Sequence, residues 1–91
     1  MQKIYSKIKE SSLICVRVGR EDITEYRNDI SSPEEFLQAS ARLLKKGIHV
    51  PAHKHLELEK KIYGTQESWI VLEGKLKATV YDLDDSKLEE L

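Results

Sequence analysis

The chain has 91 residues, of which 40% are hydrophobic and 34% charged, and its 15 basic and 16 acidic side chains leave a net charge of -1. This length predicts one domain with a modest core, and the composition excludes an intrinsically disordered chain. The balanced charge gives no reason to expect nucleic acid or an anionic membrane as a partner. No apolar stretch is long enough to span a membrane, and the single Cys15 cannot form an internal disulfide, so we expect a cytoplasmic protein.

Two short strands are predicted near the N-terminus. Residues 13–18 are mostly β-branched or apolar, and Gly19 ends the run, which indicates a strand. Residues 23–27 fit a second, shorter strand.

Residues 32–47 carry two conflicting patterns. An N-cap, a proline and a capping-box acid at residues 32–35 favour a helix, for which Gly47 would be a fitting C-cap. Apolar and polar side chains nevertheless alternate over residues 37–44, which is the period of a strand. We expect one helical turn at 33–36 and then a strand, because this places Gly47 at the start of the motif described below.

The pattern beyond Gly47 is typical of strands separated by turns. Leu56, Leu58, Lys60 and Ile62 alternate with Glu57, Glu59, Lys61 and Tyr63, which favours a strand. The composition of residues 68–73 predicts a buried strand, and Gly74 marks a tight turn into a second strand over 75–82. We therefore predict an antiparallel hairpin about this glycine.

The last residues complete the pattern. Residues 82–86 are predicted to form a turn, and residues 87–91 are polar and expected to be loosely held. Several short strands with regular turns predict an all-β sandwich or barrel.

One motif carries most of the functional information. Gly47 is followed by a His-x-His pair formed by His53 and His55, then by Glu67, and finally by Gly74. A glycine, two histidines, a glutamate and a glycine in this order resemble the first signature motif of the cupins. Cupins are small β-barrels that often hold one metal ion.

The resemblance implies a single cupin-like domain over residues 1–91, folded as a small β-barrel or half-barrel of the β-sandwich kind, with at most one short helix near 33–36. The second cupin motif is absent, so the chain looks like a truncated cupin. Residues 64–74 are similar to small cupins found with polysaccharide biosynthesis enzymes, which implies a sugar or sugar nucleotide as ligand. Cupins often dimerise, and a short barrel leaves a strand edge uncovered, so we expect a homodimer.

His53 and His55 are the candidate metal ligands. Residues two apart on an extended chain point to the same face, so both imidazoles can converge on one ion. The resemblance assigns the third position to Glu67, and Glu59 is the alternative because its place four residues after His55 fits the usual histidine-to-glutamate spacing of the motif. Two imidazoles and a carboxylate suit Zn, Fe, Mn, Ni or Co, and three protein ligands leave an open, reactive position.

Three further side chains, Gln66, Tyr63 and Trp69, are candidates to line a ligand cavity, although Trp69 also fits a core position. The sequence thus predicts a metal-dependent site for a small polar molecule and leaves open whether the protein is an enzyme. A metal-free ligand-binding module and a non-catalytic dimerising remnant of a cupin are the alternatives. The chain has no phosphate-binding Gly-rich loop and no nucleophile elbow.

Overall fold

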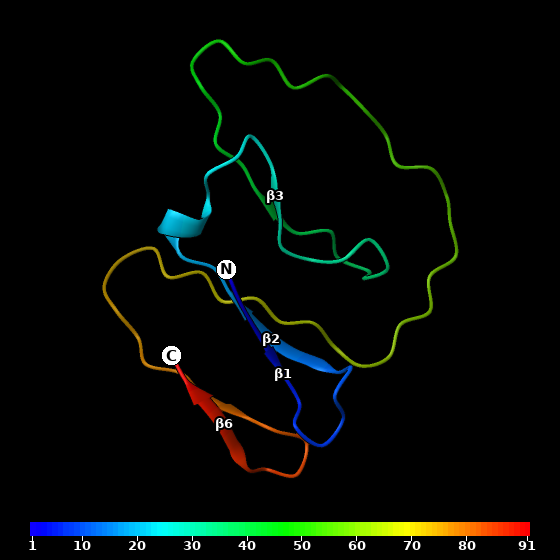
Figure 1. The fold of residues 1–91 in the computed structure, drawn as a ribbon. Coiled ribbons are helices and arrows are strands. Elements are labelled where there is room, and N and C mark those ends of the chain that lie inside the picture. The colour runs from blue at the N-terminus through cyan, green and yellow to red at the C-terminus, as the bar shows by residue number, and fades with distance from the viewer. The chain divides into compact units, whose positions relative to one another are not determined.

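A computed structural model describes residues 1–91 as short β-strands, one short helix and long connecting segments (Figure 1). The strands form three separate two-stranded sheets, β1–β2, β3–β4 and β5–β6. All three pairs are antiparallel. The predicted all-β class is therefore confirmed at the level of small antiparallel sheets, and these sheets do not close into a barrel.

The chain divides into two compact units. Residues Met1–Gly19 together with Glu67–Leu91 form the first unit, and Arg20–Gln66 form the second. The only helix, η1, spans Arg20–Asp22, and no helix has the length or apolar character needed to cross a membrane.

The first unit begins with a hairpin of β1 (Gln2–Tyr5) and β2 (Leu13–Arg17), which confirms the strand predicted for this part of the sequence. Ile4 lies opposite Cys15 in the ladder and is the buried apolar side chain of the fold, with 8% of its surface exposed. Alternation on a strand turns every second side chain to the same face, which places Ile4 inward between two outward neighbours.

A second hairpin of this unit joins β5 (Thr79–Tyr81) to β6 (Lys87–Glu90). The predicted turn between them is confirmed: the Asp82 amide donates to the Ser86 carbonyl at 2.7 Å, and Asp85 has a φ of 66°. Aspartate is one of the few residues besides glycine that adopt this left-handed conformation readily. The closed turn aligns the last residues with β5, so the prediction that they are loosely held is wrong.

The predicted hairpin about Gly74 is also wrong. Residues 68–73 form no strand, and Trp69, Ile70 and Leu72 are 73%, 81% and 93% exposed. Gly74 does turn the chain with a φ of 84°, as a hairpin glycine would. The strand that follows it, β5, pairs with the later strand β6 instead. The prediction failed because composition identifies a β-prone segment but not the strand with which it pairs.

The second unit contains one small ladder. Strand β3 (Asn28–Asp29) pairs with β4 (Ser40–Ala41), and the ladder is extended by a 2.9 Å bond from the Ile30 amide to the Ala39 carbonyl. The strand predicted at residues 23–27 is wrong, since pairing begins only at Asn28.

The expectations for the middle of the chain need two corrections. Residues 33–36 form no helix; a turn over 32–35 is closed by the Glu35 amide, which donates to the Ser32 carbonyl at 3.2 Å. The helix lies earlier, at η1. Of the strand predicted for residues 37–44, only β4 forms. Its partner β3 has two residues, so the ladder between them is short.

Candidate functional site

His53 and His55 lie together on an exposed segment of the second unit. Their ring centroids are 5.5 Å apart, and the ring planes are inclined by 59°. Both side chains are exposed, as is every residue from 42 to 59. The structure therefore brings the two predicted imidazole ligands close to one another, with access from solvent.

A backbone contact orients the ring of His53. Its Nδ1 lies 3.2 Å from the carbonyl oxygen of Pro51. A carbonyl oxygen only accepts, so Nδ1 is the donor in this contact. Metal-ligating histidines commonly donate their other ring N–H to a carbonyl in this way, and Nε2 is the His53 nitrogen that would face a metal ion.

The two candidate carboxylates belong to different units of the chain. Glu67 belongs to the first unit, and its Oε1 accepts a 2.7 Å hydrogen bond from Nε1 of Trp69. Glu59 belongs to the second unit and is exposed. No three His, Cys, Asp or Glu side chains are gathered in a way that could hold a metal ion. The two histidines thus lie close together without a third potential ligand beside them.

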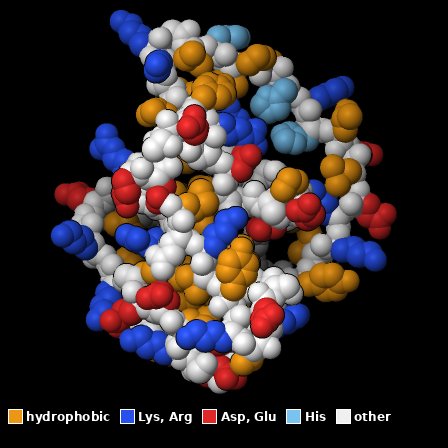
Figure 2. All heavy atoms as spheres, in the orientation of Figure 1, with side chains coloured by type: hydrophobic (Ala, Val, Ile, Leu, Met, Phe, Trp, Pro, Cys, Tyr) orange, Lys and Arg blue, Asp and Glu red, His pale blue; other side chains and the backbone are white.

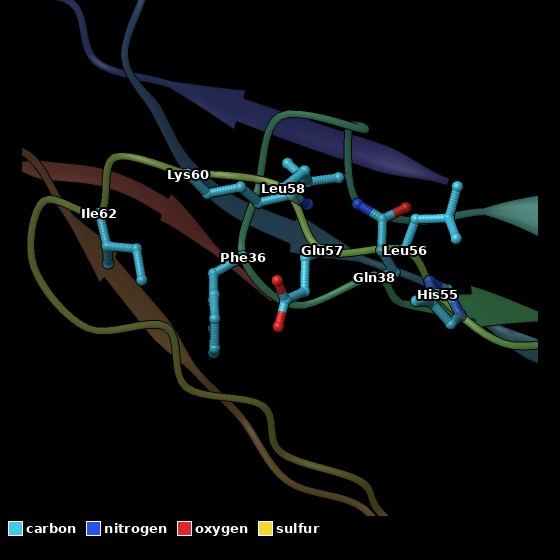
Figure 3. A pocket seen from close by; sticks show the side chains of 8 residues that line it. All are labelled: Phe36, Gln38, His55, Leu56, Glu57, Leu58, Lys60 and Ile62. Atoms are coloured by element: carbon cyan, nitrogen blue, oxygen red, sulfur yellow. The ribbon is translucent and has the colours of Figure 1, made fainter.

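A hollow of about 510 Å³ lies in the second unit beside His55 (Figure 3). Two short stretches of chain form it, and its lining residues are Phe36, Gln38, His55, Leu56, Glu57, Leu58, Lys60 and Ile62. In the close-up, the Phe36 ring and the Glu57 carboxylate extend in the same direction. The hollow therefore combines apolar surface with one amide, one imidazole, one carboxylate and one ammonium group.

The turn at residues 32–36 holds one side of this hollow in place. Its carbonyl oxygens accept hydrogen bonds from the side chains of Gln38 and Lys60; Nζ of Lys60 lies 2.7 Å from the Glu35 oxygen and 3.1 Å from that of Pro33. These side chains satisfy carbonyls that a continuing helix would have satisfied with backbone amides. The turn is thus capped by side chains.

Charge around the turn is partly balanced. The Ser32 hydroxyl, which hydrogen-bonds the carboxylate, lowers the pKa of Glu34, and the backbone of Glu34 and the nearby charge of Lys60 act in the same direction. Lys60 therefore donates hydrogen bonds to the carbonyls of the turn and also lies near the Glu34 carboxylate. Glu57 is the acidic residue that lines the hollow itself.

The predicted ligand-lining residues lie outside the hollow. Tyr63 is 90% exposed, and Trp69, in the first unit, is 73% exposed. The Gln66 side chain hydrogen-bonds the Glu35 carboxylate and accepts from the Leu37 amide at 3.3 Å. Gln66 thus braces the turn.

A buried polar cluster in the first unit was not anticipated from the sequence. The Ser6 hydroxyl donates to Oδ1 of Asp82 at 2.5 Å, and these residues are only 4% and 5% exposed. The other carboxylate oxygen accepts from the Lys7 amide at 2.8 Å, and Oδ1 also accepts from the Leu83 amide at 2.7 Å. The turn signal at Asp82 was visible, but nothing marked Ser6 as its partner.

Hydrogen bonding dominates the ionisation of this carboxylate. The Ser6 hydroxyl is the main cause that lowers the pKa of Asp82, and the amides of Leu83, Lys7 and Ile8 add to it, while burial opposes them. A carboxylate that accepts several hydrogen bonds is favoured in its charged form. The cluster contains no imidazole or thiol, so it provides no nucleophile–base pair and serves to join the two hairpins.

Comparison with known proteins adds no functional assignment. The structural features that bear on function are the His53–His55 pair, the hollow beside it and the exposed segment around both. Protein-family models, curated proteins and solved structures were compared with the chain, and none matches it.

Proposed function

We propose that the chain is a cupin-like metal-binding protein of the cytoplasm that binds or acts on a small polar molecule such as a sugar or sugar nucleotide. The observation that carries the proposal is the His53–His55 pair, whose ring centroids are 5.5 Å apart. The three antiparallel hairpin sheets support the β-rich part of the proposal. The small barrel or half-barrel remains part of the proposal, as does the single-domain organisation over residues 1–91.

The donor set suits a divalent transition metal such as Zn, Fe, Mn, Ni or Co. Nε2 of His53 would be its metal-binding nitrogen, because Nδ1 faces the Pro51 carbonyl. Glu67 is the proposed third ligand, and Glu59 is its alternative. A divalent ion held there would polarise a substrate oxygen or lower the pKa of a bound water.

This chain's own residues supply the binding surface beside the histidines. His55 belongs both to the pair and to the lining of the hollow. The polar side chains of Gln38 and Glu57 line that hollow together with Phe36. Convergent polar groups within a mostly apolar hollow are typical of small-molecule sites.

The hollow also favours a second candidate, a metal-free binding module. In that case Gln38, His55 and Glu57 would hold the ligand directly by hydrogen bonds. A third candidate, a dimerising remnant without chemistry, is favoured by the exposure of Trp69, Ile70 and Leu72, since exposed apolar side chains often mark an interface. A homodimer fits all three candidates and is part of the proposal.

Metal content distinguishes the first candidate from the others. Untagged protein, purified without chelator, should contain close to one divalent transition metal ion per chain by elemental analysis. The double variant H53A/H55A should lose it while its circular dichroism stays unchanged, because both side chains are exposed. His49→Ala is the matched control and should keep the metal. Wild-type protein without metal, even after incubation with Zn²⁺, would reject the metal proposal.

The same proteins test the binding module. Ligand binding to the folded state raises the unfolding temperature. A sugar that stabilises the metal-free protein, with the effect reduced in Glu57→Gln, would support the second candidate. A protein with neither metal nor ligand response would leave the dimerising remnant.

A further inference from the structure

The charge of this chain is unevenly distributed. Residues 37–56 contain four of the 15 basic residues and none of the 16 acidic ones, so this segment carries +4 while the remaining residues carry -5. The basic residues of this acid-free segment are Arg42, Lys45, Lys46 and Lys54. The net charge of -1 for the whole chain conceals this local excess.

The acid-free segment also exposes apolar side chains. Leu43 is 52% exposed, Ile48 48% and Leu56 77%. From residue 42 to 59 every residue is exposed, and no helix or strand lies between β4 and the end of the second unit. On the face seen in Figure 2, hydrophobic, histidine and Lys or Arg side chains gather in the loop drawn in green in Figure 1.

One end of the segment is fixed to the rest of the second unit. The guanidinium of Arg42 lies 5.5 Å from the centre of the Tyr26 ring, which places the cation over its face. Lys45 and Lys46 follow directly, with Leu43 and Leu44 before them. Basic and apolar side chains are thus presented together by one exposed loop.

We propose that the acid-free segment, residues 37–56, is an attachment site for an anionic lipid surface. Lysine and arginine side chains are attracted to anionic headgroups, and exposed leucine and isoleucine side chains gain from contact with the acyl boundary. A cytoplasmic membrane surface presents both. The inference does not depend on the metal proposal.

A lipid surface fits this segment better than a nucleic acid. Proteins that hold single-stranded nucleic acid stack bases on aromatic rings set among basic residues. Residues 37–56 contain no Phe, Tyr or Trp, and instead contain leucine, isoleucine and valine. The combination of cations with aliphatic side chains is the complement of an anionic bilayer.

Local charge outweighs net charge in this setting. The Debye length is about 10 Å at 0.1 M salt, so exposed charges further apart than that are largely screened from one another. A loop that touches a surface therefore responds to its own side chains. The near-neutral charge of the whole chain gave no reason to expect an anionic membrane as a partner, whereas the local charge of residues 37–56 does.

Vesicle co-sedimentation tests the proposal. The full chain is mixed with vesicles of phosphatidylcholine alone, or with about one-third phosphatidylserine added to give an anionic surface. Excess chelator in every sample separates this test from the metal proposal. We expect binding to the anionic vesicles only, and a marked loss of binding at high salt.

Two variants of equal charge locate the site. K45E/K46E should weaken binding at least about 25-fold, since each basic residue near an anionic surface contributes roughly a fivefold gain. K3E/K75E changes the net charge equally at exposed positions of the first unit, and it should bind like wild type. L43S/L44S should weaken binding about tenfold without altering its salt dependence.

Several outcomes would overturn the proposal. Equal binding to neutral and anionic vesicles, equal effects of K45E/K46E and K3E/K75E, or no effect of L43S/L44S would each do so. Binding of single-stranded RNA without binding of anionic vesicles would assign the segment to a different class of partner. All of these residues are exposed, so circular dichroism of each variant should match the wild type.

Discussion

The hydroxyl of Ser6 donates a 2.5 Å hydrogen bond to Oδ1 of Asp82, a residue 76 positions further along the chain. Ser6 follows β1, and Asp82 follows β5, so the bond joins the turns of two hairpins within the first unit. The Ser6 oxygen also accepts from the amides of Ile8 and Lys9 at 3.2 and 2.9 Å. Ser6 and Asp82 are buried together with the apolar side chain of Ile4 in that unit.

Replacing Ser6 with alanine should destabilise the protein. The change removes a donor from the Asp82 carboxylate and an acceptor from two backbone amides in a nearly buried site. Unsatisfied buried polar groups are costly, so we expect the melting temperature to fall by about 5 °C or more. Ser68→Ala, at an exposed position, is the control and should melt like the wild type. A Ser6→Ala protein with unchanged melting would mean that the bond is not needed.

The Asp82 carboxylate should make stability depend on pH in the acid range. Its folded pKa is lowered below the ordinary value of 3.8, chiefly by the Ser6 hydroxyl, so the unfolded chain binds the proton more readily. The stabilisation is therefore complete above that value and is lost as the pH falls through the lower folded pKa.

Thermal unfolding of wild type and Asp82→Asn across the acid range checks this sign. The wild type should be more stable at neutral pH, and the difference should shrink as the pH falls below about 3.8. Asp84→Asn is the comparison variant. Asp84 is exposed on the same turn, and the Ser86 hydroxyl lowers its pKa as well. A difference between wild type and Asp82→Asn that widens on acidification would contradict the direction of the shift.

Lys60 should stabilise the turn beside the hollow. Lys60→Met keeps the aliphatic stem but removes the ammonium that donates to the Glu35 and Pro33 carbonyls. We expect a loss of about 1 kcal/mol in the free energy of unfolding measured with urea. Lys61→Met, at the exposed neighbouring position, should cost far less. Similar losses in both variants would argue against a specific role for these hydrogen bonds.

Gly64 should be sensitive to substitution for reasons of backbone geometry alone. Its φ is 84°, and an added Cβ would meet no atom within 4 Å. Gly64→Ala should therefore cost about 1 kcal/mol from conformational strain without any clash. Gly64→Asn should cost less, because asparagine adopts left-handed conformations more readily. A stabilising alanine would show that this φ is not required.

Local chemistry made part of the fold predictable. The strand β2 follows from a β-branched run ended by glycine, and the turn after β5 follows from its aspartates and serine. Both features depend on neighbours in sequence. Partner choice was not predictable in this way: β5 pairs with β6 across the aspartate turn, while the β-prone residues about Trp69 remain exposed.

The same distinction applies to the candidate site. The closeness of His53 and His55 follows from their spacing of two on an extended segment. The hollow was not foreseen, because it depends on Phe36 and Gln38 meeting residues about 20 positions later. The Ser6–Asp82 bond is a more extreme case, since no spacing rule links residues 76 apart.

Binding of one divalent metal ion by His53 and His55 is the proposal on which the metal-dependent function depends. Imidazole nitrogen NMR spectra recorded during a Zn²⁺ titration test it most directly. We expect Nε2 of His53 and one ring nitrogen of His55 to shift together and saturate at one equivalent, while His49 stays unchanged and Nδ1 of His53 keeps its contact with Pro51. Equal, non-saturating shifts of all three histidines, or no shift at all, would contradict it.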